Sequence, residues 1–170
     1  MNSSLCLCPK ADIAAAARRC GACAVGFAAA EAVDAATASR FDRWIAAGRH
    51  ASMDYMARNR ALRLDPRLLL PGASTVISLA FSYCTSLHSP YIADYALCDD
   101  YHIALREALA PLLATLRDRY GATSRLCIDS APVLERYWAV RAGIGFIGLN
   151  RQLIVPGVGS KVFLCEIITT

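Results

Sequence analysis

The sequence lacks the long uninterrupted apolar run that a membrane-spanning helix needs. Its longest stretch without Asp, Glu, Lys or Arg runs from Leu68 to Ala93, but prolines, a glycine and several Ser and Thr residues interrupt it. The first residues also lack a basic segment followed by an apolar one, which a secretory signal would have. We therefore expect a cytoplasmic protein that does not enter the membrane.

The net charge of the chain is small, and aromatic residues are few. Basic residues number 18 and acidic residues 14, so the formal net charge is only +4, and aromatic residues make up 8% of the chain. This mild basic excess permits an RNA partner without identifying one. With 56% apolar and 19% charged residues, the 170-residue chain is expected to fold as one domain over residues 1–170.

Eight cysteines are present, but no export signal accompanies them, so reduced thiols are expected rather than disulfides. One pair has the spacing Cys20-x2-Cys23, which gives two ligands where an iron–sulfur cluster needs four. We interpret this pair as core cysteines. The remaining cysteines are Cys6, Cys8, Cys84, Cys98, Cys127 and Cys165.

Local patterns predict helices and strands along the whole chain. Helix formers, caps and helical spacing of apolar residues predict helices over 11–19, from Asp34 to Gly48, and from Asp99 or Asp100 to about Tyr120. Short helices and loops are expected over 51–72, and another helix from Pro132 to about Arg141. Strands are expected over 22–27, 75–83, 124–128, 152–155 and 161–168, the last two paired around Pro156-Gly157.

The segment DSAPVLERYWAVRAGIGFIGLN, residues 129–150, carries the strongest functional signal. Asp129 is expected at a strand end, beside a helix N-terminus and opposite a glycine-rich loop. Ligands bind at strand ends in α/β sheets, and glycines let the backbone approach a ligand closely. Asp129 is therefore a candidate proton donor if a buried pocket raises its pKa. The alternative, favoured for an isolated Asp before Ser-Ala-Pro, is a helix cap.

Six segments resemble the epoxyqueuosine reductase family, in that family's order. They are HASMDYMARN at 50–59, RLDPRLLLPGASTVIS at 63–78, YIADYALCDDYH at 91–102, CIDSAPVLER at 127–136, AGIGFIGLN at 142–150 and GSKVFLCEI at 159–167. Together these segments cover most of the chain, which makes them far more specific than any single motif.

The resemblance implies a fold and an activity. The fold would be a nitroreductase-like, cobalamin-binding domain of the α+β class, a three-layer α/β sandwich whose mixed central sheet is flanked by helices. The activity would be reduction of the epoxide of epoxyqueuosine, at the wobble position of tRNA, to give queuosine. Reduced cobalamin would serve as cofactor and tRNA carrying epoxyqueuosine as partner, whereas the electron donor stays unknown.

The resemblance also assigns site residues. Asp129 matches the family's proton donor beside the cofactor, so a desolvated setting is expected for it. Arg63 matches a cobalamin-contacting arginine, and its guanidinium suits corrin amide carbonyls or the tail phosphate. Ala93, Leu153 and Leu164 match further cofactor contacts. Tyr101 and His102 belong to a shared segment, but we expect a structural histidine there and no protein ligand to a metal.

Two departures from the family pattern bear on function. Gly148-Leu149-Asn150 stands where the family has Gly-Lys followed by Asn or His, so a basic group near the cofactor or tRNA is missing. No Cys-x2-Cys-x2-Cys-x3-Cys-Pro run is present, so the C-terminal ferredoxin-type domain is expected to be absent and its [4Fe-4S] clusters have no ligands in this chain. We therefore expect the chain to bind cobalamin but, on its own, to show weak turnover or none.

Two alternatives to this partial reductase stay open. One is a stand-alone cobalamin-binding or trafficking module, for which missing clusters are no defect. The other is an FMN-binding relative of the nitroreductases, since that fold also receives FMN. Asp129 and Arg63 favour the reductase, because a carrier needs no acid beside the cofactor.

Overall fold

A four-stranded sheet in the order β1-β2-β6-β3 forms the centre of the fold. The computed structural model describes residues 9–83 and 88–170. Its sheet contains β1 (Ala24–Ala29), β2 (Thr75–Ser82), β6 (Val162–Thr169) and β3 (Ser124–Cys127). All three strand pairs are antiparallel, so the expected mixed sheet is wrong, while the expected α+β class is confirmed.

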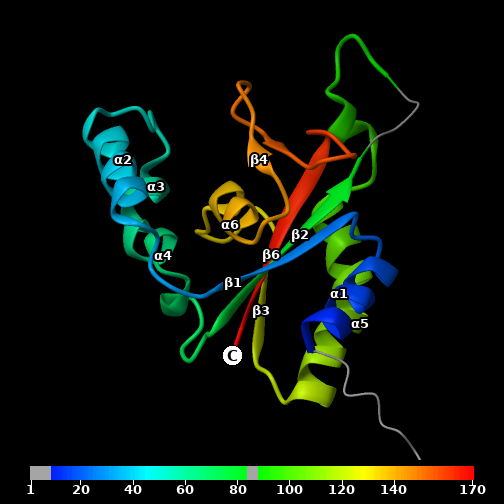
Figure 1. Ribbon diagram of the computed structural model, residues 1–170. Coiled ribbons are helices and arrows are strands. Elements are labelled where there is room, and N and C mark those ends of the chain that lie inside the picture. The colour runs from blue at the N-terminus through cyan, green and yellow to red at the C-terminus, as the bar shows by residue number, and fades with distance from the viewer. Residues whose placement is uncertain (1–8, 84–87) are drawn as a thin grey trace, which may run out of the picture.

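The two central strands are apolar enough to be covered on both faces. In β2, the sequence TVISLAFS is β-branched and aromatic, and its residues from Val76 to Phe81 are all buried. It pairs along its full length with β6, from Thr75 opposite Thr169 to Ser82 opposite Val162. Figure 1 shows these two strands crossing the middle of the molecule, with helices on either side.

One face of the sheet is covered by α1 (Pro9–Arg19) and α5 (Tyr101–Tyr120), which lie side by side. The predicted caps of α5 are confirmed, because Asp100 accepts a hydrogen bond from the backbone N–H of His102 and Gly121 adopts a left-handed conformation at φ 65°. Its apolar side packs on the odd-numbered residues of the central strands. The buried residues of α5 are Leu105, Leu109, Leu112 and Leu116.

The other face carries α6 and a group of shorter helices. Trp138 of α6 (Glu135–Arg141) is only 2% exposed and packs with Val76, Cys127 and Ile168 of the sheet. The same cluster extends to α2 (Ala35–Ala46), whose predicted cap Asp34 accepts from the backbone of Thr37. The short helices predicted over 51–72 are confirmed as α3 (Asp54–Arg58), α4 (Arg60–Leu64) and the 3-10 helix η1 (Pro66–Leu68).

Two predictions around the glycine-rich loop are wrong. The helix expected from Pro132 begins only at Glu135, so residues 129–134 form a loop. The strands expected to pair around Pro156-Gly157 do not pair with each other, because β5 (Leu153–Ile154) pairs with β4 (Phe146–Ile147) and β6 joins the main sheet. The glycine-rich loop can pack closely against β5 because residue 145 is a glycine. A Cβ there would fall on the backbone carbonyl of Ile154.

Cysteine thiols in the described residues are free, at Cys20, Cys23, Cys98, Cys127 and Cys165. Cys6, Cys8 and Cys84 lie outside the described residues. The prediction that Cys20 and Cys23 are both core residues is wrong for Cys23, which is exposed, although its thiol donates to the carbonyl oxygen of Ala80 at 3.1 Å. None of the helices within 9–83 and 88–170 is long and apolar enough to span a membrane.

Candidate functional site

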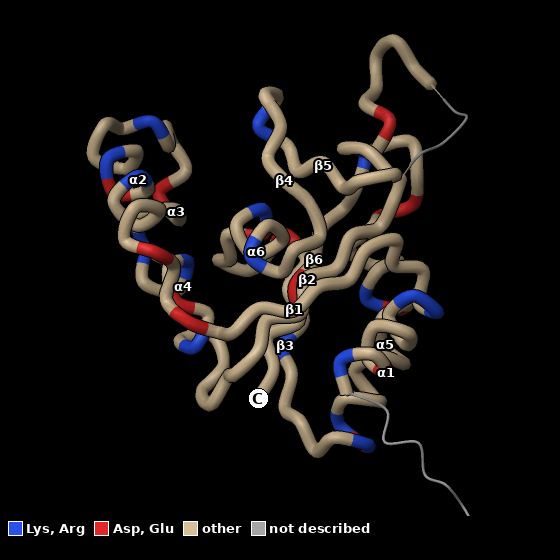
Figure 2. Tube along the Cα trace, in the orientation of Figure 1, with Lys and Arg blue, Asp and Glu red and all other residues tan. Residues whose placement is uncertain are grey.

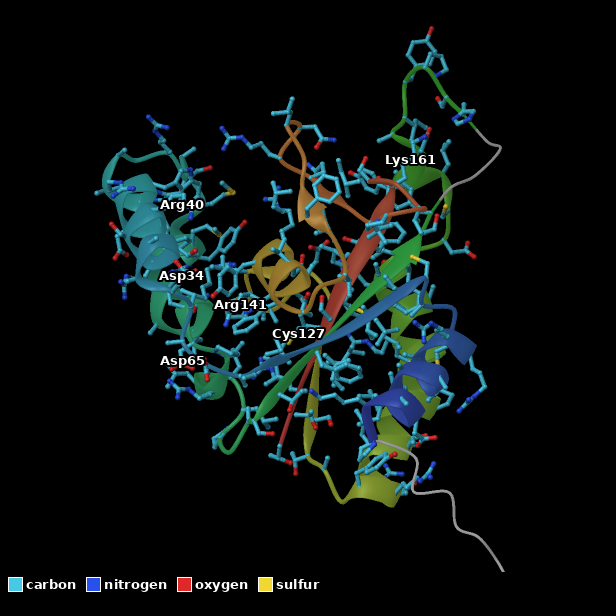
Figure 3. All side chains as sticks on the ribbon, viewed as in Figure 1. Asp34, Arg40, Asp65, Cys127, Arg141 and Lys161 are labelled. Carbon is cyan, nitrogen blue, oxygen red and sulfur yellow. The ribbon has the colours of Figure 1, made fainter. Side chains whose placement is uncertain are left out.

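Asp129 lies two residues after the end of β3, at the start of the loop that leads to α6. The two residues before it, Cys127 and Ile128, are buried, and Figure 3 shows Cys127 at the centre of the molecule beside α6. Asp129 has a positive φ of 51°, a conformation that Asp tolerates better than most residues. The loop therefore turns sharply at Asp129 and presents its carboxylate beside the start of α5.

Tyr101, the first residue of α5, holds the carboxylate of Asp129. Its hydroxyl donates a hydrogen bond to Oδ2 of Asp129, and its ring stacks on Phe163 of β6 with centroids 4.1 Å apart. Burial, together with the hydrogen bond to Asp129, raises the pKa of Tyr101 well above its usual value. Tyr101 is therefore a neutral donor at any physiological pH, held in place by an aromatic partner on the sheet.

His102, the next residue of α5, faces the same carboxylate oxygen of Asp129 as Tyr101. Its Nε2 lies 4.0 Å from Oδ2 of Asp129, while its Nδ1 lies 2.9 Å from Oδ1 of Asp100. The imidazole also stacks on the ring of Tyr101 at 4.1 Å. Asp100 thus orients a histidine whose second nitrogen faces Asp129, a more specific placement than the purely structural role that the sequence predicted.

Glu135 anchors the Asp129 loop from the opposite end. The backbone N–H of Asp129 donates to Oε1 of Glu135 at 3.0 Å, which ties the first residue of α6 to the turn. Burial, and then the nearby charge of Asp129, raises the pKa of Glu135 to about 7. Protonation of Glu135 thus takes place near neutral pH.

A third carboxyl group lies deeper in the sheet. Glu166 of β6 is completely buried, and its Oε1 accepts a hydrogen bond from the hydroxyl of Ser78 on β2 at 3.1 Å. Burial and the charge of Glu135 raise the pKa of Glu166 well above its usual value, so this group is neutral. A line of acidic residues therefore runs from the exposed turn into the core.

Asp129 lines a cavity of about 300 Å³ at the carboxyl end of β3. One wall is apolar and comes from β6, whereas the opposite rim carries charged and amide side chains from α6 and the β4–β5 hairpin. The lining residues are Tyr101, Asp129, Glu135, Arg136, Gln152, Val162, Phe163 and Leu164. The cavity therefore places the carboxyl group of Asp129 beside apolar side chains of β6, within a lining that also carries charged and amide groups.

The structure brings some of the predicted cofactor contacts together and separates others. Asp129 and Leu164 line the same cavity. Leu153 is 2% exposed and packs in the core cluster against which Leu164 lies, so it supports the wall from behind. Ala93 is exposed at the start of the 3-10 helix η2 (Asp94–Leu97), whose Asp94 forms an ion pair with Lys161 next to the wall.

Arg63 is on α4 and does not line the cavity. Its Nε is buried and has no hydrogen-bond partner within the described parts of the chain, while its guanidinium carbon lies 5.9 Å from the ring centre of Tyr55. Burial lowers the pKa of Arg63, and the charges of Tyr55 and Glu135 oppose that shift. A half-buried guanidinium with an unused N–H is suited to donate a hydrogen bond to a phosphate or an amide carbonyl.

The desolvated setting that the sequence predicted for Asp129 is not found around its own side chain, which is 53% exposed. It is found at Glu135 and Glu166 instead. The partners of Asp129 were not identified from the sequence, although Tyr101 and Glu135 both fall in segments that carried the family resemblance. Within the described ranges, no group of three or more His, Cys, Asp or Glu side chains is placed to hold a metal ion.

Comparison with known proteins finds that the chain is similar to epoxyqueuosine reductases. The family model "Epoxyqueuosine reductase QueG, DUF1730" matches residues 63–130, which include Arg63, Tyr101 and Asp129. An epoxyqueuosine reductase from Cyclobacterium marinum is 40% identical over 138 residues, which are 77% of this chain and 44% of the relative. That of Gloeobacter violaceus is 40% identical over 94% of this chain and 51% of its own length.

Solved structures agree with these relatives. A crystal structure of epoxyqueuosine reductase with an epoxyqueuosine-modified tRNA-Tyr stem loop matches with a TM-score of 0.79 and 26% identity. The match covers 94% of this chain and 44% of that chain. The chain therefore spans about half the length of the relatives it matches.

Proposed function

Because the chain belongs to the epoxyqueuosine reductase family and spans about half the length of its curated relatives, we propose that it forms the catalytic, cobalamin-binding part of such a reductase. The reaction converts epoxyqueuosine in tRNA to queuosine. Removing the epoxide oxygen as water consumes two electrons and two protons and leaves a carbon–carbon double bond. Reduced cobalamin, when bound, would supply the electrons, while the protein positions the reactants and supplies one of the two protons, the other coming from solvent.

Asp129 supplies that proton in our proposal. The hydroxyl of Tyr101 donates a hydrogen bond to Oδ2 of Asp129, which leaves Oδ1 as the oxygen that would carry the proton given to the substrate oxygen. Glu135 holds the backbone N–H of the same residue and fixes its left-handed turn. Tyr101 and Glu135 act as positioning residues, because each contacts Asp129 rather than the reacting atoms.

Four further residues are proposed to form the cofactor site, three by direct contact and Leu153 by supporting the wall from beneath. Arg63 offers its unpaired Nε to an amide carbonyl or to the phosphate of the cofactor's tail. Leu164 provides apolar wall beside Asp129, and Leu153 packs beneath that wall. Ala93 leaves an exposed backbone segment without a bulky side chain where a flat ring can approach. The full reductase would also need [4Fe-4S] clusters and an electron donor, which we assign to other protein segments.

One observation carries the proposal: an acid held by a tyrosine, beside an apolar wall, in a chain whose relatives are epoxyqueuosine reductases. The test supplies the protein with cobalamin, a chemical one-electron reductant and an epoxyqueuosine-modified stem loop, and measures queuosine by mass spectrometry. We expect Asp129→Asn to bind cobalamin normally and to form no queuosine. Unaltered queuosine formation by Asp129→Asn would remove Asp129 from the mechanism.

A further inference from the structure

A second hollow lies beside α2, apart from the cavity of Asp129. Its volume is about 880 Å³, and its lining residues are Thr37, Arg40, Phe41, Arg43, Trp44, Ala46, Ala47, Arg49, Leu134 and Arg151. A smaller hollow of about 370 Å³ adjoins it and shares Thr37, Arg40 and Arg151. The smaller one adds Arg136, Tyr137, Val140 and Ile147. We call the two together the arginine cleft.

The arginine cleft concentrates positive charge in a concave surface. Five arginines line it, and the described linings contain no Asp or Glu. Figure 2 shows basic residues along α2, on α6 and near the tip of the β4–β5 hairpin, and Figure 3 shows Arg40 on α2. Guanidinium groups gathered at one site repel one another, so the arrangement is stabilised by an anion.

These five arginines differ from the four arginines of the described chain that are ion-paired. Arg60, Arg67, Arg117 and Arg119 each form an ion pair with an aspartate at 2.5 to 2.7 Å. None of the cleft arginines has a carboxylate within that reach among residues 9–83 and 88–170. Two of them form other bonds, since Arg43 donates to the hydroxyl of Ser39 and Arg136 donates to the backbone oxygen of Arg151. Arg136 also lies near the charge of Glu135, so the charge of the other four is the part most available to a ligand.

The arginine cleft leads toward Asp129. Arg136 lines both the smaller hollow and the Asp129 cavity, so an extended ligand can lie along α2 and reach the acid at its end. Arg151 can replace the lysine that the family has at the position of Leu149. Leu149 is fully exposed to solvent, whereas Arg151, at φ 65°, lines the cleft. A cation two residues along the chain thus faces the ligand path.

We propose that the arginine cleft binds the sugar–phosphate backbone of the RNA strand that flanks the reacting nucleotide. Five guanidinium groups spread along the cleft are better suited to bind successive phosphates than to bind one small anion. The partly buried rings of Trp44 and Tyr137 in the same lining offer surfaces on which unpaired bases stack. That the reacting base lies at Asp129 rests on the proposed function. Binding of the RNA sugar–phosphate backbone in the arginine cleft does not.

The test measures RNA binding without cobalamin and without turnover. A labelled RNA stem loop with an unmodified anticodon is titrated with the protein, and fluorescence anisotropy is recorded at several salt concentrations. The double variant Arg40→Ala with Arg151→Ala should bind roughly tenfold more weakly, and the slope of log affinity against log salt should fall by about two. Arg43→Ala with Arg49→Ala is a second double variant that should act in the same direction.

The matched control removes two exposed arginines from the opposite face of the sheet, Arg18 of α1 and Arg106 of α5. It changes the net charge equally and should leave affinity almost unaltered. An equal loss in the control and cleft variants would overturn the proposal, as would displacement of RNA by polyglutamate at the same charge concentration. A cleft variant that loses cobalamin affinity but keeps RNA affinity would assign the arginine cleft to the cofactor's phosphate and likewise refute it.

Base stacking gives an independent readout. Trp138 is buried at 2% exposure, so quenching of tryptophan fluorescence by RNA should come from Trp44. The quenching should disappear in Trp44→Phe, which keeps an aromatic ring at that position. Quenching that persists unaltered in Trp44→Phe would place the RNA elsewhere. Because every arm measures binding, failure of epoxide reduction leaves these outcomes unaffected.

Discussion

Glu135 offers a test of the electrostatics around Asp129 that needs no ligand. The substitution Glu135→Gln keeps the size of the side chain and an oxygen that can accept the backbone N–H of Asp129, but removes the titrating charge. Burial and the charge of Asp129 raise the pKa of Glu135 from 4.5 to about 7. The folded protein therefore keeps a proton that the unfolded chain releases between these two values.

The size and sign of the effect follow from linkage. Because the folded-state pKa is raised, the stability associated with the neutral form is fully present below about pH 4.5 and is lost as pH rises through about 7. At about 1.4 kcal/mol per pKa unit, the parent protein loses about 3 kcal/mol of unfolding free energy over this window. Glutamine is neutral at every pH and escapes this loss, and its amide oxygen keeps an acceptor for the backbone N–H of Asp129.

Glu135→Gln should therefore be about 3 kcal/mol more stable than the parent at pH 8 and within about 1 kcal/mol of it at pH 5. Urea unfolding followed by tryptophan fluorescence at pH 5, 6, 7 and 8 measures the difference, and Trp138 on α6 is a nearby reporter. Glu107→Gln, on the exposed side of α5, is the matched control and should show no such trend. A stability difference that stays constant from pH 5 to 8 would refute the reasoning.

Three further substitutions test separate parts of the structure. Tyr101→Phe keeps the stacking on Phe163 but removes the hydrogen bond to Asp129, so queuosine formation should slow by about tenfold with unchanged cobalamin affinity; an unchanged rate would contradict this. Arg63→Met should weaken cobalamin binding by about tenfold in a spectroscopic titration, with Arg58→Met as the unaffected control. Gly26→Ala should lower the unfolding free energy by roughly 3 kcal/mol, because its Cβ would fall on the carbonyl oxygen of Ala142, and wild-type stability would show that α6 can shift.

Local signals in the sequence predicted the elements well. Asp34 and Asp100 are capping residues with nearby backbone N–H groups to satisfy, and Gly121 reaches the left-handed region easily, so these helix ends depend on neighbouring residues alone. Strand β2 was also predicted, because its β-branched and aromatic run is long and continuous. Such features are encoded within a few positions of the chain.

Strand pairing was not predicted, because it depends on contacts between distant segments. The segment at 161–168 has alternating apolar residues that fit either a hairpin with 152–155 or the centre of the main sheet. The docking of Gly145 against Ile154 decides between them, and it arises only when the glycine-rich loop folds back. The expectation of a mixed sheet came from the family resemblance rather than from the residues.

The site was predicted in part for the same reason. Asp129 was identified because it follows a strand within a distinctive segment. Tyr101 lies 28 positions earlier, and its bond to Asp129 exists only because the start of α5 packs beside the end of β3. The arginine cleft was missed because its residues come from α2, α6 and the β4–β5 hairpin, which packing alone brings together.

Cobalamin binding by the purified protein tests the central proposal most directly. Cob(II)alamin is titrated with the protein and its visible spectrum is followed, and the titration is repeated with FMN. The account predicts a saturable change in the cobalamin spectrum, weakened in Arg63→Met, and no binding of FMN. A cobalamin spectrum that stays unchanged while FMN binds would contradict the account and favour a flavin-binding relative.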